Sequence, residues 1–492
     1  MRALAGAAAG LVAAGFGVAT AEVLAAATRP AAGPLIAVGG AVIDATPTAV
    51  KEFAVRELGT SDKPVLLTVI GLVVAALAAV AGIAGRRRPL LVVAGPAVLG
   101  LAGAGAALSR PAAEPYDVVP SLVGAALAGL ALWWLLRGGD RTSGVRVDRR
   151  RFLRAAALVA GGAVVASGGA VAVRRSVGGA RARARESVRL PAAADTGPSV
   201  DAGLLTPNKD FYRVDTALTV PRIDLDGWSL RVHGMVDREL RLSFADLLAL
   251  PLIERPVTMT CVSNEVGGPY LGTARWLGVP LAPLLRSLGV KSGAEQLVAR
   301  SVEGMTIGTP VATLLDGRDA MLAVGMNGEP LPLEHGFPAR MLTPGVYGYA
   351  GSCKWLSSLE LTTFDQFDPY WVSRGWAAEA PVKTGSRVDR PRPFARLTAG
   401  TVTVAGVAWA QRRGIEAVEV RIDDGPWAQA ELLPAPSVDT WVQWRYSWPA
   451  VAGPHSIAVR ATDRTGAVQT QSRATPFPSG ATGWHTISVT VS

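Results

Sequence analysis

MNGEPLPLEHGFPAR, residues 326–340, which runs on through PGVYG and SCK to Trp355, carries more structural information than any other segment of the chain. Its many glycines and prolines surround one histidine, one arginine and one lysine, His335, Arg340 and Lys354. Glycine and proline restrict a segment to defined turns, so these side chains are expected on rigid loops. Fixed donors of this kind suit a phosphate or another anionic group.

A second informative segment is TMTCVSN, residues 258–264, in which an apolar run ends at Cys261 and polar residues and the turn GGP follow. A strand that ends in this way delivers a side chain into a loop at the functional edge of a domain. A lone cysteine is also commonly a small buried hydrophobe, so both roles are open for Cys261. The chain's two cysteines, Cys261 and Cys353, could pair, but a chain of 492 residues does not need a disulfide scaffold.

Together these segments resemble the sulfite oxidase family of molybdopterin enzymes. The pattern M-N-G-x-P-L-P-x-x-H-G-x-P-x-R, then P-G-x-x-G and K-W, is similar to that family's hallmark. Upstream, C-x-x-N at Cys261, TARW at 273–276 and FYR at 211–213 resemble further family elements, and all occur in the family's order. The resemblance covers roughly 207–355 and does not include the apolar N-terminal third. An ordered set of this length is far more specific than one short motif.

The resemblance implies a molybdenum-molybdopterin cofactor, with the Cys261 thiolate as the protein ligand of the metal. Thiolate is a soft donor that suits such a metal. The family also implies a catalytic role for Cys261 and Arg213. The residues that match its cofactor-binding positions are Phe211, Tyr212, Arg213, Cys261, His335, Arg340, Ser352, Cys353 and Lys354. Cys353 stands where the family usually has an aliphatic residue, and we expect its side chain to serve in packing.

The sequence departs from the family at the substrate pocket. Sulfite oxidases follow C-x-x-N with a pair of arginines, whereas this chain has Glu265 and Val266. A carboxylate beside a dianion would repel it by several kcal/mol at low effective dielectric. Near the family's active-site tyrosine position this chain has Asp365, and Tyr370 is out of register. Arg213 is the one arginine of the family's substrate pocket that we can match in this sequence. We therefore expect the chain to retain the cofactor-binding residues of the family but not its sulfite-binding pocket.

These features predict an oxidoreductase that transfers an oxygen atom on a small sulfur or nitrogen compound. The direction stays open between reduction of an S-oxide or N-oxide and oxidation of a sulfite-type substrate. The sequence has no C-x-x-C-H haem motif and no iron–sulfur cysteine cluster, so a separate cytochrome or quinone-linked electron partner is expected. The alternative is a non-catalytic, membrane-anchored surface protein with a degenerate molybdopterin domain.

The first third of the chain is dominated by alanine, glycine, valine and leucine. It holds five apolar runs of the length, about 20 residues, that a membrane-spanning helix needs. Glu22 interrupts the first run, which could instead be a signal peptide. The five runs are Ala3–Ala27, Val65–Gly85, Leu90–Leu108, Val118–Leu136 and Phe152–Val173.

Arginine-rich loops predict the orientation of these spans. The loops at 86–88 and 137–151 are rich in arginine, and the positive-inside rule assigns them to the cytoplasm. The chain after Val173 is then outside, which predicts a multi-pass cell-membrane protein with an extracytoplasmic catalytic domain. DRRRFLR at 148–154 also resembles a twin-arginine export signal, which would carry a folded, cofactor-loaded domain. A plain basic stop before a helix is the alternative.

Composition argues against other functional classes. The net charge of +10 comes mostly from arginines clustered between apolar runs, without the interleaved aromatics of a nucleic-acid surface, so we expect no nucleic-acid partner. The four histidines, His233, His335, His455 and His485, all lie outside the apolar runs, so these runs cannot bind a b-type haem through paired imidazoles.

The residues after about 390 predict an all-β domain. Alternation at Val418, Val420 and Ile422 ends in the hairpin signal DDG, and four tryptophans, 409, 427, 444 and 448, are of a buried type. An immunoglobulin-like sandwich is expected, and the resemblance implies a homodimer through it. The predicted multidomain architecture is an α-helical transmembrane bundle, a linker, an α+β molybdopterin domain of sulfite oxidase type and this all-β sandwich. Their bounds are 1–173, 174–206, 207–390 and 391–492.

Overall fold

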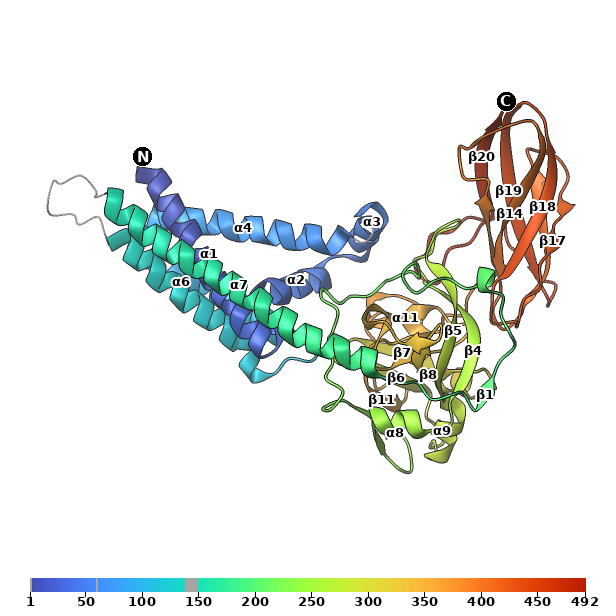
Figure 1. Ribbon diagram of the computed structural model, residues 1–492, viewed down its shortest axis with the longest axis horizontal. Coiled ribbons are helices and arrows are strands. Elements are labelled where there is room, and N and C mark those ends of the chain that lie inside the picture. The colour runs from blue at the N-terminus through green and yellow to red at the C-terminus, as the bar shows by residue number, and fades with distance from the viewer. Residues whose placement is uncertain (1, 59–60, 138–148) are drawn as a thin grey trace. The chain divides into compact units, whose positions relative to one another are not determined.

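The computed structural model describes residues 2–58, 61–137 and 149–492 (Figure 1). The chain forms two compact units. The first comprises Met1–Arg183 with Ala217–Arg222, and the second comprises Ala184–Thr216 with Ile223–Ser492. The two units are described separately.

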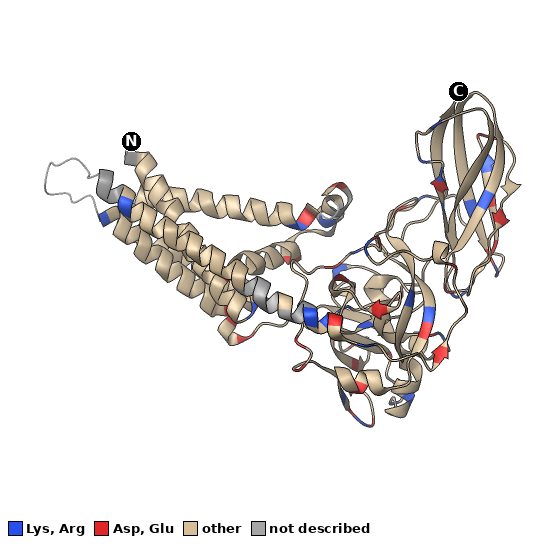
Figure 2. Cartoon of the chain, viewed as in Figure 1, with Lys and Arg blue, Asp and Glu red and all other residues tan. Residues whose placement is uncertain are grey.

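The first unit is helical. Five of its helices are long and apolar enough to cross a membrane, and they coincide with the five predicted runs. Figure 2 shows that charged residues are sparse along these helices. The segment between Arg29 and Lys63 contains the shorter helices α2 and α3. The helices are α1 (Arg2–Ala27), α2 (Pro34–Ala45), α3 (Thr48–Leu58), α4 (Asp62–Gly85), α5 (Leu90–Leu108), α6 (Val119–Arg137) and α7 (Arg149–Ser187).

Small residues let α1 pack closely against α4. A Cβ atom at Gly10 would lie 1.9 Å from the carbonyl oxygen of Ala78, and one at Gly82 would lie 2.1 Å from that of Gly6. Only glycine permits backbones to approach this closely, a packing mode common between apolar helices.

The segment predicted as a linker differs from expectation at its start. Helix α7 runs without a break through Arg174 to Ser187. Alanine and arginine are strong helix formers, and they outweigh the glycines in this stretch. Its last turn belongs to the second unit, where Arg185 donates to the carbonyl oxygens of Leu331 and Pro330 at 2.7 and 2.6 Å. Residues 138–148, which include much of the predicted cytoplasmic arginine loop, lie outside the described residues.

The second unit begins with an α+β module, residues 184–216 and 223–384, built on two sheets. The first has the order β1-β4-β5-β8-β10 with β9 paired to β8, and the second has the order β3-β2-β11-β6-β7. One hydrophobic core joins them, with Trp276 of β5 and Leu230 of β2 among its fully buried side chains. The strands are β1 (Asp195–Thr196), β2 (Ser229–Gly234), β3 (Leu240–Ser243), β4 (Ile253–Thr260), β5 (Leu271–Pro280), β6 (Gln296–Ser301), β7 (Thr306–Pro310), β8 (Met321–Met326), β9 (Glu329–Pro330), β10 (Arg340–Leu342) and β11 (Leu356–Thr362).

Short helices follow several of these strands. Ser243 caps α8, since its side chain accepts from the Asp246 amide in a capping box. Helix α9 begins directly after Pro280. The helices are α8 (Phe244–Ala249), α9 (Leu281–Ser287), α10 (Val311–Leu315) and α11 (Gly348–Gly351).

The C-terminal sandwich, residues 385–492, consists of two sheets around one core. Their strand orders are β12-β14-β18-β17 and β13-β20-β19-β15-β16. The sandwich begins with strand β12, which precedes the predicted domain boundary at 390/391. Its immunoglobulin-like assignment stays a prediction. The strands are β12 (Gly385–Arg390), β13 (Arg396–Leu397), β14 (Gly400–Trp409), β15 (Ile415–Ile422), β16 (Ala428–Gln429), β17 (Glu431–Leu432), β18 (Val442–Ala450), β19 (Gly453–Asp463) and β20 (His485–Val491).

The four tryptophans expected in the sandwich core divide into three groups. Trp444 and Trp448 lie in the core, whereas Trp409 packs in a separate cluster with residues of the α+β module such as Tyr347. Trp427 is only half-buried, so its expected core position is wrong. Its ring packs edge-on against Trp484 and under Arg460 on the outside of the second sheet, because it follows the exposed DDG turn.

Candidate active site around Cys261

Strand β4 ends immediately before Cys261, which is buried with 8% of its surface exposed. The Cys261 amide donates to the carbonyl oxygen of Tyr270 at 2.9 Å, and its own carbonyl accepts from the Asn264 amide at 3.1 Å. The side-chain oxygen of Asn264 accepts from the Tyr270 amide at 2.8 Å. These bonds fold the C-x-x-N element into a compact turn that fixes the thiol. Cys261 and Cys353 are both free thiols.

Burial raises the pKa of the Cys261 thiol, while hydrogen bonds from Ser263 and the positive charge of Lys354 act in the opposite direction. A thiol in such a site is protonated until a cation displaces the proton. A bound metal deprotonates a coordinating thiol outright. The raised pKa therefore argues against a free thiolate nucleophile at this position.

The FYR segment lies against the histidine of the hallmark loop. The rings of Phe211 and Tyr212 stack with centroids 5.3 Å apart, and Phe211 meets His335 edge-on at 5.5 Å. Gly272 of β5 makes this possible, since a Cβ there would lie 2.9 Å from the Phe211 ring. Burial, with the nearby Cys261, raises the pKa of Tyr212, so its hydroxyl stays protonated.

His335 and Arg340 form the buried polar centre of the loop. The Nε2 atom of His335 lies 3.1 Å from the carbonyl oxygen of Asn208, and burial with the charge of Arg340 lowers its pKa to about 4. The ring is thus neutral at pH 7, and Nε2 carries the proton that it donates to Asn208. Sequence reasoning missed Asn208, whose contact depends on the folded loop.

Arg340 is a buried cation with an unused donor. Its Nη1 donates to the carbonyl oxygen of His335 at 3.1 Å, and its guanidinium lies 5.1 Å from the centre of the Trp276 ring. Its Nε has no hydrogen-bond partner among the described residues. Burial lowers the pKa of Arg340 to about 10, so it remains charged at pH 7. A buried, charged guanidinium whose Nε is unpaired among the described residues fits an anionic group such as a cofactor phosphate.

Lys354 is held by Asp215, a residue that the sequence reasoning did not select. The Nζ atom of Lys354 donates to Asp215 Oδ2 at 2.7 Å and to the carbonyl oxygen of Glu334 at 3.2 Å. Asp215 also accepts from Arg213 Nε at 2.9 Å, and Arg213 is one-third exposed. Burial lowers the pKa of Lys354 to about 8, against the opposing effect of Asp215. The position of Asp215 two residues after FYR was the signal available in the sequence.

Ser352 and Cys353 complete the loop that leads to Lys354. The Ser352 amide donates to the carbonyl oxygen of Gly348 at 3.0 Å. Cys353 is 1% exposed and belongs to the hydrophobic core, and burial raises its pKa to about 12. Its side chain therefore packs and stays protonated, which agrees with the role expected for it.

A hollow lies beside Thr260 and Asn264, which flank the Cys261 turn, and has walls from both parts of the second unit, but Cys261 itself does not line it. Its lining includes Thr260, Asn264, Tyr347, Lys383, Trp409 and Gln469. Glu265 also lines it but is an exposed residue. No arginine lines it in the described part of the chain.

Arginine and lysine side chains near this hollow are engaged by other groups. Lys383 Nζ donates to the carbonyl oxygen of Gly480 at 2.6 Å. Arg413 pairs with Asp463 at 2.8 Å. Tyr370 is absent from the lining and lies under the guanidinium of Arg374, 3.5 Å from its ring centre.

Comparison with known proteins shows which sequences and structures the chain resembles. Residues 217–371 match the oxidoreductase molybdopterin binding domain family. Sulfite oxidase of Gallus gallus is 30% identical over 317 residues, which are 54% of this chain and 68% of that one. The uncharacterized oxidoreductase YuiH of Bacillus subtilis (strain 168) is 34% identical over 153 residues, 31% of this chain and 74% of that one. The solved structure of sulfane dehydrogenase SoxCD from Paracoccus pantotrophus aligns with a TM-score of 0.49 and 24% identity, covering 55% of this chain and 75% of that one.

Proposed function

Because the chain belongs to the sulfite oxidase family of molybdopterin-dependent oxidoreductases, we propose that it transfers an oxygen atom to or from a small sulfur or nitrogen compound. The observation that carries the proposal is the buried cluster of segments around Phe211, Cys261, His335 and Lys354, in which Arg340 Nε has no acceptor within the described part of the chain. Such a cluster is what a metal-bearing, phosphorylated cofactor requires.

The residues divide between holding the metal and holding the anionic part of the cofactor. Cys261 would ligate molybdenum, and the hydrogen bonds from Ser263 would stabilise its thiolate. Arg340 and Lys354 would bind anionic groups, while Phe211 and the neutral His335 would orient the pterin. When bound, the molybdenum-molybdopterin cofactor supplies the two-electron oxygen-atom transfer. The protein's own contribution is to orient the cofactor and to shape the substrate site.

We favour a neutral S-oxide or N-oxide as substrate over sulfite. The hollow lined by Thr260 and Asn264, next to the Cys261 turn, has Lys383 but no arginine in its described lining. A dianion would therefore lack the paired donors that stabilise it. Glu265 adds repulsion, although its exposure means that solvent screens much of that charge.

The apolar helices and arginine-rich loops support a multi-pass membrane protein whose α+β module is extracytoplasmic. Arg149 and Arg150 would act in twin-arginine export. A separate cytochrome or quinone-linked protein would exchange electrons with the site, and the C-terminal sandwich would form a homodimer.

The test is metal content and turnover of the purified full-length chain. We expect about one molybdenum per chain, and Cys261→Ser should abolish turnover with a panel of sulfoxides, N-oxides and sulfite. Cys353→Val is the matched control, because it removes the other buried thiol and should keep metal and activity. A metal-free chain that is fully active, or an active Cys261→Ser variant, would refute the assignment. A metal-free, inactive chain would indicate a binding protein instead.

A further inference from the structure

Strand β4 approaches Cys261 with one edge lacking a strand partner. It pairs with β5 from Ile253 to Thr260 along its whole length. On its other edge β1 pairs only at Ile253 and Glu254, and no further strand continues this edge among the described residues. The backbone groups nearest Cys261 therefore need other partners, because buried amides and carbonyls are rarely left unpaired.

The C-terminal sandwich supplies these partners. The Nε2 atom of Gln411 donates to the carbonyl oxygen of Thr258 at 3.1 Å and to the hydroxyl of Thr260 at 3.3 Å. The Thr258 amide donates to the carbonyl oxygen of Asp439 at 2.9 Å, and the Trp441 amide donates to the Thr258 hydroxyl at 2.7 Å. These residues are at most 9% exposed, and Gln411 is 1% exposed.

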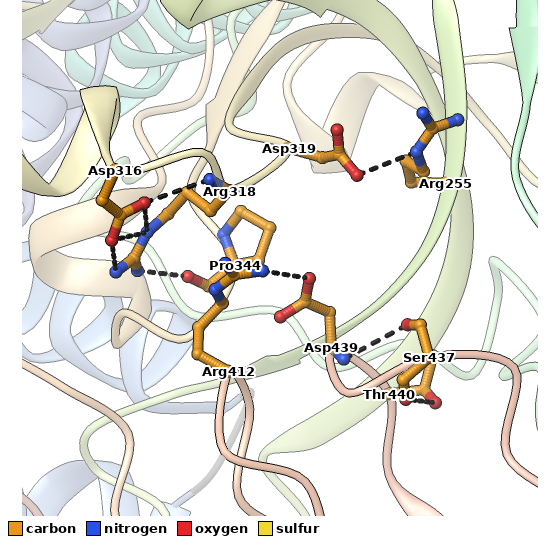
Figure 3. A network of polar contacts seen from close by, with 9 residues as sticks. All are labelled: Arg255, Asp316, Arg318, Asp319, Pro344, Arg412, Ser437, Asp439 and Thr440. Carbon is orange, nitrogen blue, oxygen red and sulfur yellow. Dashed lines mark hydrogen bonds and ion pairs between the residues drawn. The ribbon is translucent and has the colours of Figure 1, made fainter.

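The turn that carries Gln411 packs against the PGVYG segment of the α+β module through Arg412. Arg412 adopts a left-handed backbone conformation with φ of 68°, and its Nη1 donates to Asp439 Oδ2 at 3.2 Å (Figure 3). Gly345 of the PGVYG segment makes room for it, since a Cβ there would lie 2.7 Å from Arg412 Cγ. Arg318 holds the same segment by donating to the carbonyl oxygen of Pro344 at 2.6 Å, as Figure 3 also shows.

We propose that Gln411 is a positioning residue that holds the end of β4, and through it the Cys261 thiol, in register with the site. Without its amide, the Thr258 carbonyl and the Thr260 hydroxyl lose a buried donor, and the strand end before Cys261 gains freedom. A displacement of about 1 Å at a reacting centre can cost about a hundredfold in rate. The inference rests on the proposed function only in taking Cys261 as the metal ligand.

Thiol labelling tests this role without any bound cofactor. Full-length chain is prepared from cells that make no molybdopterin, in a Cys353→Val background, so that a maleimide reads Cys261 alone. We expect Gln411→Met, which keeps the volume and removes the donor, to label about tenfold faster than the parent, the factor for one to two lost net hydrogen bonds. Gln443→Met is the matched control. Gln443 Nε2 also donates from the sandwich to a module carbonyl, that of Gly203 at 3.0 Å, but not on β4.

The holoenzyme gives a second reading. In Gln411→Met, kcat should fall by ten- to a hundredfold with KM within about twofold, and Gln411→Asn should recover part of the loss. Equal labelling rates in Gln411→Met and the parent, or an equal increase in Gln443→Met, would overturn the proposal. The labelling difference does not depend on catalysis. A chain that shows it but never binds molybdenum would therefore refute the proposed function and leave the positioning of Cys261 intact.

Discussion

Asp215→Asn should separate charge from shape in the anion-binding part of the site. The asparagine oxygen can still accept from Lys354 Nζ, now 2.7 Å from Asp215 Oδ2, but the negative charge is gone. Burial already lowers the pKa of Lys354 to about 8, and Asp215 is the largest effect that opposes it. An opposite charge at this range commonly shifts a pKa by about 1 to 3 units. In the variant the pKa of Lys354 should therefore fall to between about 5 and 7.

The consequence is measurable as cofactor retention against pH. Lysine binds an anion only when protonated, so the wild-type chain should lose molybdenum as pH rises through about 8. In Asp215→Asn the same loss should begin at least one pH unit lower. Purified protein is dialysed at a series of pH values from 5 to 9, and molybdenum per chain is measured.

A control variant isolates the local effect. Glu239→Gln makes the same change in net charge at an exposed pair with Arg231, 2.8 Å away, and should leave the retention curve unchanged. Curves for Asp215→Asn and wild type that superimpose would refute the electrostatic role of Asp215. So would an equal shift in Glu239→Gln.

Three further predictions concern stability, substrate and topology. The pKa of His335 is about 4 in the folded chain and about 6.5 when unfolded. The free energy of unfolding, measured in urea, should therefore fall by about 3 kcal/mol as pH drops from about 6.5 to 4. In His335→Gln this decrease should be smaller. Steady-state kinetics should give sulfite a kcat/KM below about 10⁴ M⁻¹s⁻¹, with faster sulfoxide or N-oxide reduction; a larger value for sulfite would contradict the pocket reasoning. A reporter fused after Val173 should lie outside and one at Gly139 inside, and changing Arg149 and Arg150 to lysine should block export; undiminished export would leave both as topology determinants only.

Sequence reasoning reached the parts of the site that lie on contiguous motifs. His335 and Arg340 belong to one glycine- and proline-rich loop, and Cys261 ends a strand whose apolar pattern is plain. Asp215 and Gln411 could not be found in this way, because their roles depend on contacts across 139 and 153 residues of chain. Local periodicity does not record which distant segments meet.

The fold shows the same division between local and long-range information. The five apolar runs and the alternating strand β15 were visible in the sequence, since each is a local repeat of hydrophobicity. Trp427 was misplaced because a tryptophan's burial depends on which sheet face it reaches. Helix α7 continues into the expected linker because alanine and arginine favour a helix there, even though the stretch has no periodic apolar face.

In the proposed substrate site, Glu265 is not the main obstacle that we expect for a dianion. Glu265 was expected to repel a dianion, but it is exposed, and solvent weakens its field. A further reason lies in the C-terminal sandwich, where two arginines near the hollow are held by carboxylates. Arg413 is paired with Asp463 and Arg387 with Asp389, at 2.8 and 2.6 Å. A dianion would have to break such pairs to gain a guanidinium, whereas a neutral oxide needs none of them. Substitution of Glu265 alone should therefore raise sulfite turnover only slightly.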